Sequence, residues 1–330
     1  MFTSCPVSRS RRKLTNAFLF AVYPPLLALL TTSNENYTIF ANDHGVAYAI
    51  DISEPTLNET EIAEMADAVA KTAFFLYTRK NPRQGQVLLL DDLDNIRNSF
   101  WDSKRPTRLI THGWHGNIDS VVCTLVRDAY LKAGDYNVIL IDWQKAASYL
   151  IYWKSASSVP QVASRAALML NFLEENAGLN PDTTKLIGHS LGAHISGLAA
   201  RFANSEINEV LALDPAKPSF SGKNPGSRVD KTDAFRVQVI HTSVGVLGMK
   251  EAIGTADFYP NGGGKQPGCS LWDLIGVCAH SRSYMYYAES IVNPKGFRAD
   301  DVFMGGPILD AKAKGEYVLE TASESPFALG

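Results

Sequence analysis

Short apolar runs that alternate with helical patterns constrain the fold of this chain more than any other sequence feature. Most of the runs are continuously apolar, which is typical of strands buried on both faces of a largely parallel sheet. Strands that alternate with helices in this way indicate an α/β architecture. The predicted strands lie at residues 74–77, 87–90, 108–111, 138–141, 186–187, 210–213 and 237–240, and the predicted helices at 120–133, 160–177, 193–202 and 281–291.

The N-terminal segment differs from the rest of the chain. A basic stretch around Arg11, an apolar stretch at 18–30 and small polar residues at 31–33 predict a secretory signal peptide over residues 1–33. The apolar stretch falls short of the roughly 20 residues that span a membrane, although an uncleaved anchor is the alternative. Glycosylation sequons at Asn36 and Asn58 also suit export. We therefore expect a secreted, extracellular protein with one domain over residues 34–330.

Charge and cysteine content narrow the function classes. The net charge is −3, and no lysine- or arginine-rich run lies outside the N-terminus, so no nucleic-acid partner is expected. Of the four cysteines, Cys5 would leave with the signal peptide. Cys269 and Cys278 are close in sequence and lie beside glycines, so we expect them to form a disulfide. Cys123 lies among apolar residues at helical spacing and is expected to be a buried, inert thiol.

A Gly-x-Ser-x-Gly pattern at residues 188–192 identifies the candidate nucleophile, Ser190. The pattern follows the apolar residues 186–187 and opens a helix rich in small residues. A sharp strand-to-helix turn crowds the backbone at the serine, so the positions two residues away on either side must lack side chains. Gly188 and Gly192 meet this need. An ordinary glycine-rich turn that ends in a serine is the alternative interpretation.

A serine hydroxyl needs a base to take its proton, and histidine suits that role near neutral pH. Where the nucleophile stands on such a turn, the acid and the histidine follow it in sequence, which leaves His241 and His280. His241 ends a predicted strand, whereas His280 lies just before a predicted helix. We favour His280, because a base on a loop can reach the edge of the sheet.

The acid should follow a buried strand at the same edge. Asp214 comes directly after the strand at 210–213 and precedes a proline, although Asp-Pro also begins many turns. The other candidates follow no comparably buried strand; they are Asp230, Asp233, Asp257 and Asp273. We therefore predict a triad of Ser190, Asp214 and His280.

A tetrahedral intermediate needs backbone N–H groups where its negative charge develops. The residue after the nucleophile, Leu191, is expected to supply one. The second should come from the loop after an early strand, where residues 111–114 read Thr-His-Gly-Trp. Trp114 is the candidate donor on that loop.

Taken together, these motifs resemble the pancreatic lipase family. The resemblance runs from about residue 70 to Phe327 and rests on Thr-His-Gly-Trp at 111–114, Asn-Val-Ile-Leu-Ile-Asp-Trp at 137–143, Gly-His-Ser-Leu-Gly-Ala-His at 188–194, Leu-Asp-Pro-Ala at 213–216, Asp-Phe-Tyr-Pro-Asn-Gly-Gly at 257–263 and Cys-Ala-His-Ser-Arg-Ser-Tyr at 278–284. It implies an α/β-hydrolase fold with a mostly parallel central sheet flanked by helices. It also implies the same triad and the same two oxyanion donors.

Departures from the family pattern bear on the substrate. Pancreatic triacylglycerol lipases carry a long lid between two cysteines and a C-terminal β-sandwich domain. Here only residues 270–277 separate Cys269 from Cys278 and the chain stops at residue 330, so neither that second domain nor a colipase partner is expected. A short lid, together with a shortened segment at 241–257, resembles the phospholipase A1 branch. The apolar lid residues should either touch a lipid surface or pack over the rim of the active site; they are Leu271, Trp272, Leu274 and Ile275.

A further departure concerns calcium. Arg228, Asp230 and Asp233 resemble the structural calcium loop of the family, but Pro225 replaces an acidic residue there. Two carboxylates with carbonyls would hold Ca²⁺ only weakly. We therefore expect no metal and no other cofactor.

The resemblance predicts hydrolysis of lipid esters through an acyl-enzyme, at the surface of a membrane or a lipid droplet. Phospholipase A1 is the favoured activity, and a triacylglycerol or galactolipid lipase is the alternative. A non-catalytic lipid-binding or yolk-type storage protein on the same fold is the alternative from another class. Such storage proteins typically lack the nucleophile, whereas this chain has all three triad residues.

Overall fold

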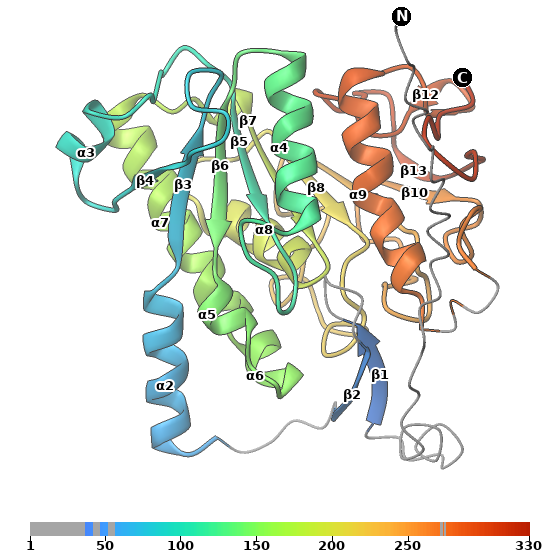
Figure 1. Ribbon diagram of the computed structural model, residues 1–330, viewed down its shortest axis with the longest axis horizontal. Coiled ribbons are helices and arrows are strands. Elements are labelled where there is room, and N and C mark those ends of the chain that lie inside the picture. The colour runs from blue at the N-terminus through green and yellow to red at the C-terminus, as the bar shows by residue number, and fades with distance from the viewer. Residues whose placement is uncertain (1–36, 42–46, 52–56, 271–272, 274) are drawn as a thin grey trace, which may run out of the picture. The chain divides into compact units, whose positions relative to one another are not determined.

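A nine-stranded sheet forms the centre of the protein in this computed structural model (Figure 1). The structure describes residues 37–41, 47–51, 57–270, 273 and 275–330. The strand order is β13-β10-β9-β8-β7-β5-β6-β3-β4. Neighbours from β13 to β6 are parallel, whereas β3 is antiparallel to both β6 and β4. The strands are β3 Ala73–Tyr77, β4 Gln86–Leu88, β5 Thr107–Thr111, β6 Asn137–Asp142, β7 Thr184–His189, β8 Glu209–Leu213, β9 Arg236–Ile240, β10 Ala256–Pro260 and β13 Gly315–Leu319.

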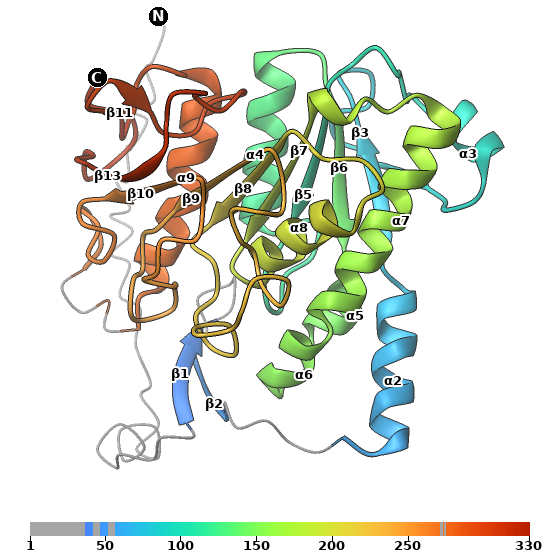
Figure 2. The same ribbon diagram turned by 180° about the vertical axis from the view of Figure 1, so that it is seen from behind.

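Helices cover both faces of this sheet. Helices α4 and α9 lie side by side on one face, and α7 and α8 lie side by side on the other (Figures 1 and 2). Two small antiparallel sheets, β1 Tyr37–Ala41 with β2 Ala47–Asp51 and β11 Arg298–Ala299 with β12 Val302–Phe303, lie apart from the central ladder. The helices are α2 Glu59–Ala70, α3 Leu93–Arg97, α4 Val121–Ala133, α5 Gln144–Ala147, α6 Tyr152–Ser157, α7 Val159–Ala177, α8 Leu191–Phe202 and α9 Val277–Val292, with a 3₁₀ turn at Pro181–Thr183.

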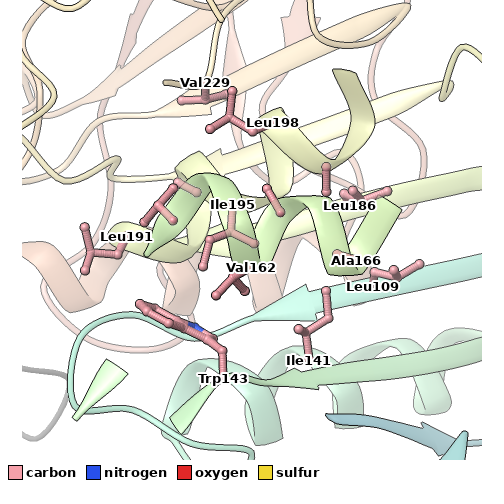
Figure 3. Close-up of a cluster of buried hydrophobic side chains, with 14 of the residues drawn as sticks. Leu109, Ile141, Trp143, Val162, Ala166, Leu186, Leu191, Ile195, Leu198 and Val229 are labelled. Atoms are coloured by element: carbon pink, nitrogen blue, oxygen red, sulfur yellow. The ribbon is translucent and has the colours of Figure 1, made fainter. Parts of the chain in front are cut away.

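The central strands are apolar throughout because both of their faces are buried. In β5, Leu109 belongs to the cluster under α7 and α8, whereas the next residue, Ile110, belongs to the cluster under α4 and α9. Figure 3 shows the first cluster, in which Val162 of α7 lies beside Trp143, and Leu109 and Leu186 belong to the same cluster. Burying one such side chain stabilises the fold by roughly 1.5–3 kcal/mol. The continuous apolar runs of the sequence therefore correspond to strands of a two-sided core.

The parallel strands bring several loops to one edge of the sheet. Thr111 pairs with Gly188, His189 with Leu213, and Leu213 with Ile240, so β5, β7, β8 and β9 end nearly level. In open α/β sheets, ligands bind outside the carboxyl ends of the strands. The residues that follow these four strands therefore lie where a site is expected.

This architecture confirms the predicted α/β-hydrolase fold. All seven predicted strands are present, whereas several other elements, among them β10, β13 and helix α2, were not predicted. The prediction that α9 begins at 281 is wrong, since it begins at Val277. Residues 36–330 form one unit by their internal contacts, which agrees with a single domain.

Of the residues in the N-terminal predictions, the structure describes Asn58 but not the others. The predicted signal peptide at 1–33 and the sequon residue Asn36 lie outside the described residues. Asn58 is exposed at the start of α2, where its side chain accepts a hydrogen bond from the Glu61 amide, and its glycosylation stays a prediction. In the described part of the chain, every helix is too short or too polar to cross a bilayer.

Candidate active site

Ser190 stands on a tight turn between β7 and α8. Its backbone has φ 58° and ψ −121°, a conformation that non-glycine residues adopt only at a cost of about 1–3 kcal/mol. A Cβ at Gly188 would lie 1.9 Å from the carbonyl oxygen of Gly192, and a Cβ at Gly192 would lie 2.5 Å from the carbonyl oxygen of His112. Both flanking glycines are thus required by close backbone approaches, as expected for a turn that presents a nucleophile.

Asp214 follows β8 beside this turn. The Ser190 amide donates to the carbonyl oxygen of Leu213, so the serine lies next to the end of β8. The Asp214 carboxylate is fully buried, and its Oδ1 accepts hydrogen bonds from the amides of Thr242 (2.8 Å) and Ser243 (3.1 Å). A Cβ at Gly248 would lie 2.3 Å from that oxygen. Two amides and a glycine therefore fix this carboxylate in place.

The His280 ring lies against both the acid and the nucleophile turn. Its Nδ1 is 2.5 Å from Asp214 Oδ2, and its ring centroid is 4.3 Å from that of His189, the residue before Ser190. Because Nδ1–H donates a hydrogen bond to the carboxylate, the lone pair of a neutral ring lies on Nε2. The structure thus brings Ser190, Asp214 and His280 to one edge of the sheet.

One prediction about His280 is wrong: it does not stand on a loop. It lies in the first turn of α9, and its amide donates to the carbonyl oxygen of Gly276. The helix starts early because the Asp273 carboxylate accepts hydrogen bonds from the amides of Cys278 (3.3 Å) and Ala279 (3.0 Å). Such bonds satisfy amides that a helix start leaves without partners. Because the N-terminus of α9 lies at the edge of the sheet, the His280 ring contacts Asp214 from a helix instead of from the expected loop.

His241, the alternative base, belongs to a separate pair. Its Nε2 is 2.9 Å from Asp257 Oδ1, and its Nδ1 is 3.0 Å from the carbonyl oxygen of Met249. Its ring also stacks on Tyr259, with centroids 4.3 Å apart. The imidazole is fully buried and its polar atoms face β10 and its preceding loop instead of Asp214. This arrangement favours His280 as the partner of Asp214.

The loop after β5 is fixed by its side chains. The indole Nε1 of Trp114 donates to the carbonyl oxygen of Tyr149 (3.0 Å), and that of Trp143 donates to the carbonyl oxygen of His112 (2.9 Å). The amide of His115 donates to Ala147. Because Gly192 touches this loop, the first turn of α8 and the loop face one another. The amides of Trp114 and Leu191 stay the predicted oxyanion donors.

The disulfide between Cys269 and Cys278 is present, with the two Cα atoms 5.7 Å apart. It ties the segment before α9 to the first turn of that helix. Cys123 is buried on α4, as predicted. Of the predicted lid residues, Leu271, Trp272 and Leu274 lie outside the described residues, and Ile275 is partly exposed.

The carboxylates of the calcium-like loop have other partners. Asp233 accepts a hydrogen bond from the Asp230 amide (2.7 Å) and lies 3.3 Å from Arg201, while burial raises the pKa of its carboxyl to about 6. Asp230 lies 3.6 Å from Arg228 and accepts a hydrogen bond from the Thr232 amide. Two carboxylates paired with arginines and amides leave little charge for Ca²⁺, so these residues do not fit a calcium site.

Sequence reasoning did not find the residues that support the triad. The amides of Thr242 and Ser243 carry no sequence signal, because any residue there except proline has an N–H. Gly248 was one glycine among 24. Asp273 had a usable signal, since an acidic residue shortly before a helix is typical of a cap.

The sequence of this chain is similar to those of known lipases. The model of a protein family described as "Lipase" matches residues 48–302. Pancreatic triacylglycerol lipase of Mus musculus is 37% identical over 251 residues, which cover 70% of this chain and 54% of that protein. The enzyme of the same name from Homo sapiens is 36% identical over 68% of this chain and 53% of its own length. Inactive pancreatic lipase-related protein 1 of Canis lupus familiaris is 37% identical over 68% of this chain and 52% of its own length.

The chain thus spans about half the length of the curated relatives it matches. Among solved structures, MGS-M1, an alpha/beta hydrolase enzyme from a Medee basin deep-sea metagenome library, is 18% identical with a TM-score of 0.33 and covers 65% of this chain and 72% of that one.

Proposed function

Because this chain belongs to the lipase family, we propose that it is a secreted serine hydrolase that cleaves carboxylic esters of lipids. One observation carries the proposal. The His280 ring is hydrogen-bonded to the buried Asp214 and packs on His189, the residue that precedes Ser190. A histidine held between a carboxylate and a serine is the arrangement that activates a hydroxyl nucleophile.

In the proposed reaction, Ser190 Oγ attacks the ester carbonyl carbon while His280 Nε2 takes the hydroxyl proton. The carbonyl oxygen becomes negative and accepts hydrogen bonds from the amides of Trp114 and Leu191. His280 then returns the proton to the leaving alcohol, and an acyl-enzyme remains. Water, deprotonated by the same ring, then attacks the acyl carbon, and the ring gives the proton to Ser190 Oγ as the fatty acid leaves. Asp214 holds the ring in the productive tautomer and stabilises its charged form.

Phospholipase A1 activity is the first candidate within this class. The observation that favours it is the short segment between the disulfide cysteines, which are only nine positions apart. The short connection from β9 to β10 points the same way, since both segments would rim the site. Triacylglycerol hydrolysis is the second candidate, because relatives from mouse and human are pancreatic triacylglycerol lipases.

Substrate assays separate the two candidates. The purified protein is given phosphatidylcholine labelled separately at each acyl position, and triolein in parallel. Release from the sn-1 position with little release from triolein supports phospholipase A1, whereas the reverse pattern supports a triacylglycerol lipase. Galactolipid in a third arm tests the remaining lipase alternative.

A Ser190→Ala variant is the control for the nucleophile. Removing the serine of such a triad lowers turnover by about 10⁶-fold. A fluorophosphonate label should attach to the wild-type protein and not to the variant. A storage or lipid-binding protein would take up no label, and a variant that retained ester hydrolysis would contradict the assignment of Ser190.

A further inference from the structure

A second histidine–aspartate pair lies next to the triad and takes no part in the proposed reaction. His241 directly follows β9, and Asp257 lies in β10, which pairs with β9 (Figure 2). Both side chains are buried. The two residues after His241 are Thr242 and Ser243, whose amides donate to the carboxylate of Asp214. The pair therefore adjoins the residues that hold the triad acid.

The ring of His241 links two parts of the chain. Its Nδ1 lies 3.0 Å from the carbonyl oxygen of Met249, and its Nε2 lies 2.9 Å from Asp257 Oδ1. A carbonyl oxygen only accepts, so Nδ1 carries a hydrogen and donates it. Asp257 is itself fixed, because its two oxygens accept hydrogen bonds from the amides of Ile253 (3.0 Å) and Gly254 (2.9 Å). The ring thus ties Met249 to an anchored carboxylate.

Residues 242–248 form a loop whose two ends meet at this ring. The loop begins at the residue after His241, and it ends at the residue before Met249, whose carbonyl oxygen accepts the Nδ1 hydrogen. The Met249 amide donates to the carbonyl oxygen of Pro215 (2.9 Å), the residue after Asp214. His241 therefore fixes the start of the loop through the backbone and its end through the bond to Met249.

Both ends of the loop touch the triad acid. At its start, the amides of Thr242 (2.8 Å) and Ser243 (3.1 Å) donate to Asp214 Oδ1. At its end, Gly248 lies so close that a Cβ there would be 2.3 Å from the same oxygen. The position of the Asp214 carboxylate therefore depends on how tightly the loop is closed.

We propose that His241 is a positioning residue for Asp214: its ring, anchored on Asp257, holds residues 242–248 closed against the carboxylate through the bond to Met249. The inference rests on the proposed function. Asp214 must stay in place to keep the base in its productive tautomer. A displacement of 1 Å that originates away from the reacting atoms can lower the rate by about 10²-fold. A loosened loop would therefore slow the reaction although His241 touches no substrate.

Two substitutions separate the two bonds of the ring. In His241→Asn the amide nitrogen takes the place of Nδ1 and can still donate to Met249, whereas in His241→Gln it takes the place of Nε2 and can donate only to Asp257. On a monomeric p-nitrophenyl ester, His241→Asn should keep kcat within about threefold of wild type, and His241→Gln should lower kcat by at least about tenfold. KM should not change in either variant, because substrate binding is untouched.

Asn137→Ala is the control for a general loss of stability. Asn137 is a buried side chain at the start of β6, and its amide nitrogen donates to the carbonyl oxygen of Asp102 (2.8 Å). This end of the parallel strands is opposite the candidate active site. Asn137→Ala should therefore unfold at a lower urea concentration with kcat and KM unchanged. All assays are run where urea unfolding shows each variant to be folded.

Nuclear magnetic resonance of protein labelled with ¹⁵N-histidine gives a readout on the acid itself. The signal is that of the His280 Nδ1–H, which donates to Asp214 and is assigned by its absence from His280→Gln. It should shift in His241→Gln, because the carboxylate moves, and should stay in place in Asn137→Ala.

Equal kcat values for folded His241→Asn and His241→Gln, or an unshifted His280 signal in His241→Gln, overturn the inference. If neither variant folds, Asp257→Asn replaces them. It weakens the anchor of the ring and should lower kcat at unchanged KM, and a wild-type kcat overturns the inference. In each case the proposed function stands as long as wild type reacts with a fluorophosphonate. A wild-type protein that takes up no label overturns the proposed function, and the inference with it.

Discussion

At the scale of single residues, the position of Asp214 depends on a neighbour without a side chain. Gly248 leaves room for Asp214 Oδ1, the carboxylate oxygen that accepts hydrogen bonds from the amides of Thr242 and Ser243. Moving the acid of a triad out of place is costly, since removing it lowers turnover by about 10⁴-fold. Gly248 therefore positions Asp214 although it takes no part in the chemistry itself.

Gly248→Ala should lower kcat by at least tenfold, because its Cβ would lie 2.3 Å from Asp214 Oδ1 and the carboxylate must shift. Gly264→Ala is the matched control, since a Cβ there meets no atom within 4 Å. The measurement is kcat on a monomeric ester together with the melting temperature. Equal kcat values for the two folded variants would contradict this account of Asp214.

At the scale of elements, the start of α9 decides where the base stands. Asp273→Ala should destabilise the protein by roughly 0.5–2 kcal/mol, the usual cost of a lost cap, and should also lower kcat, because His280 lies in the turn that Asp273 caps. Asp273→Asn keeps an acceptor oxygen and should retain most activity. Urea unfolding and ester assays measure the two effects.

The control for the Asp273 prediction is a cap far from the site. Asp92 accepts a hydrogen bond from the Asn95 amide at the start of α3. Asp92→Ala should lose comparable stability with an unchanged kcat. If both variants lost activity in proportion to stability, the positioning role of Asp273 would be wrong.

The disulfide acts on the same helix end. Replacing both Cys269 and Cys278 by serine should lower the free energy of unfolding by about 2.7 kcal/mol, the chain-entropy estimate for a loop of this size. The difference in urea midpoint between wild type and the double variant measures it. A difference near zero would mean that the loop is already ordered in the unfolded chain.

The sequence predicted those elements whose own residues form a recognisable apolar pattern. Central strands such as β5 and β8 are buried on both faces, so their apolar runs are visible without knowledge of the fold. Strand β10 was missed because Asp257 lies within it, a buried carboxylate that accepts hydrogen bonds from the amides of Ile253 and Gly254 and lies 2.9 Å from the ring of His241. The edge strand β13 is largely exposed and carries little apolar signal. The first omission reflects partners that a local pattern does not contain, and the second reflects the exposure of an edge strand.

The same reasoning applies to the candidate site. Ser190, Asp214 and His280 could be selected because strand ends and chain order restrict them. The contacts of Phe40 with Trp114 and His280 could not be predicted, because they join residues more than 70 positions apart in the sequence. Helix α2 was missed although Asn58 and Glu61 form a capping box, a pattern hidden by the sequon that begins at the same asparagine.

At the scale of the whole molecule, buried groups set the response of stability to pH. Burial lowers the pKa of His194 to about 3, and the ring lies between the carbonyl oxygen of Ala216 and the amide of Val229. The folded protein therefore keeps this ring neutral, whereas the unfolded chain protonates it below its usual value of 6.5. His194 thus makes the protein less stable as pH falls from 6.5 towards 3. Asp233 acts in the opposite direction between 3.8 and 6, because its pKa is raised on folding.

The contribution of His194 can be isolated with His194→Gln. This variant should be less stable than wild type at pH 7, and the difference should shrink by roughly 3 kcal/mol by pH 4, at about 1.4 kcal/mol for each pH unit below 6.5. Asp233 is present in both proteins, so its contribution cancels. Urea unfolding from pH 4 to 8 measures the difference, and a constant difference would contradict the buried neutral histidine.

The order in which the triad residues occur along the chain has a consequence for biosynthesis. The acid and the base are 66 positions apart, and the base is carried by the last long helix. A chain whose translation stalls, or which a protease cuts, before α9 would have its serine and its carboxylate but nothing to remove the hydroxyl proton. Ester hydrolysis would therefore be withheld until translation has passed α9.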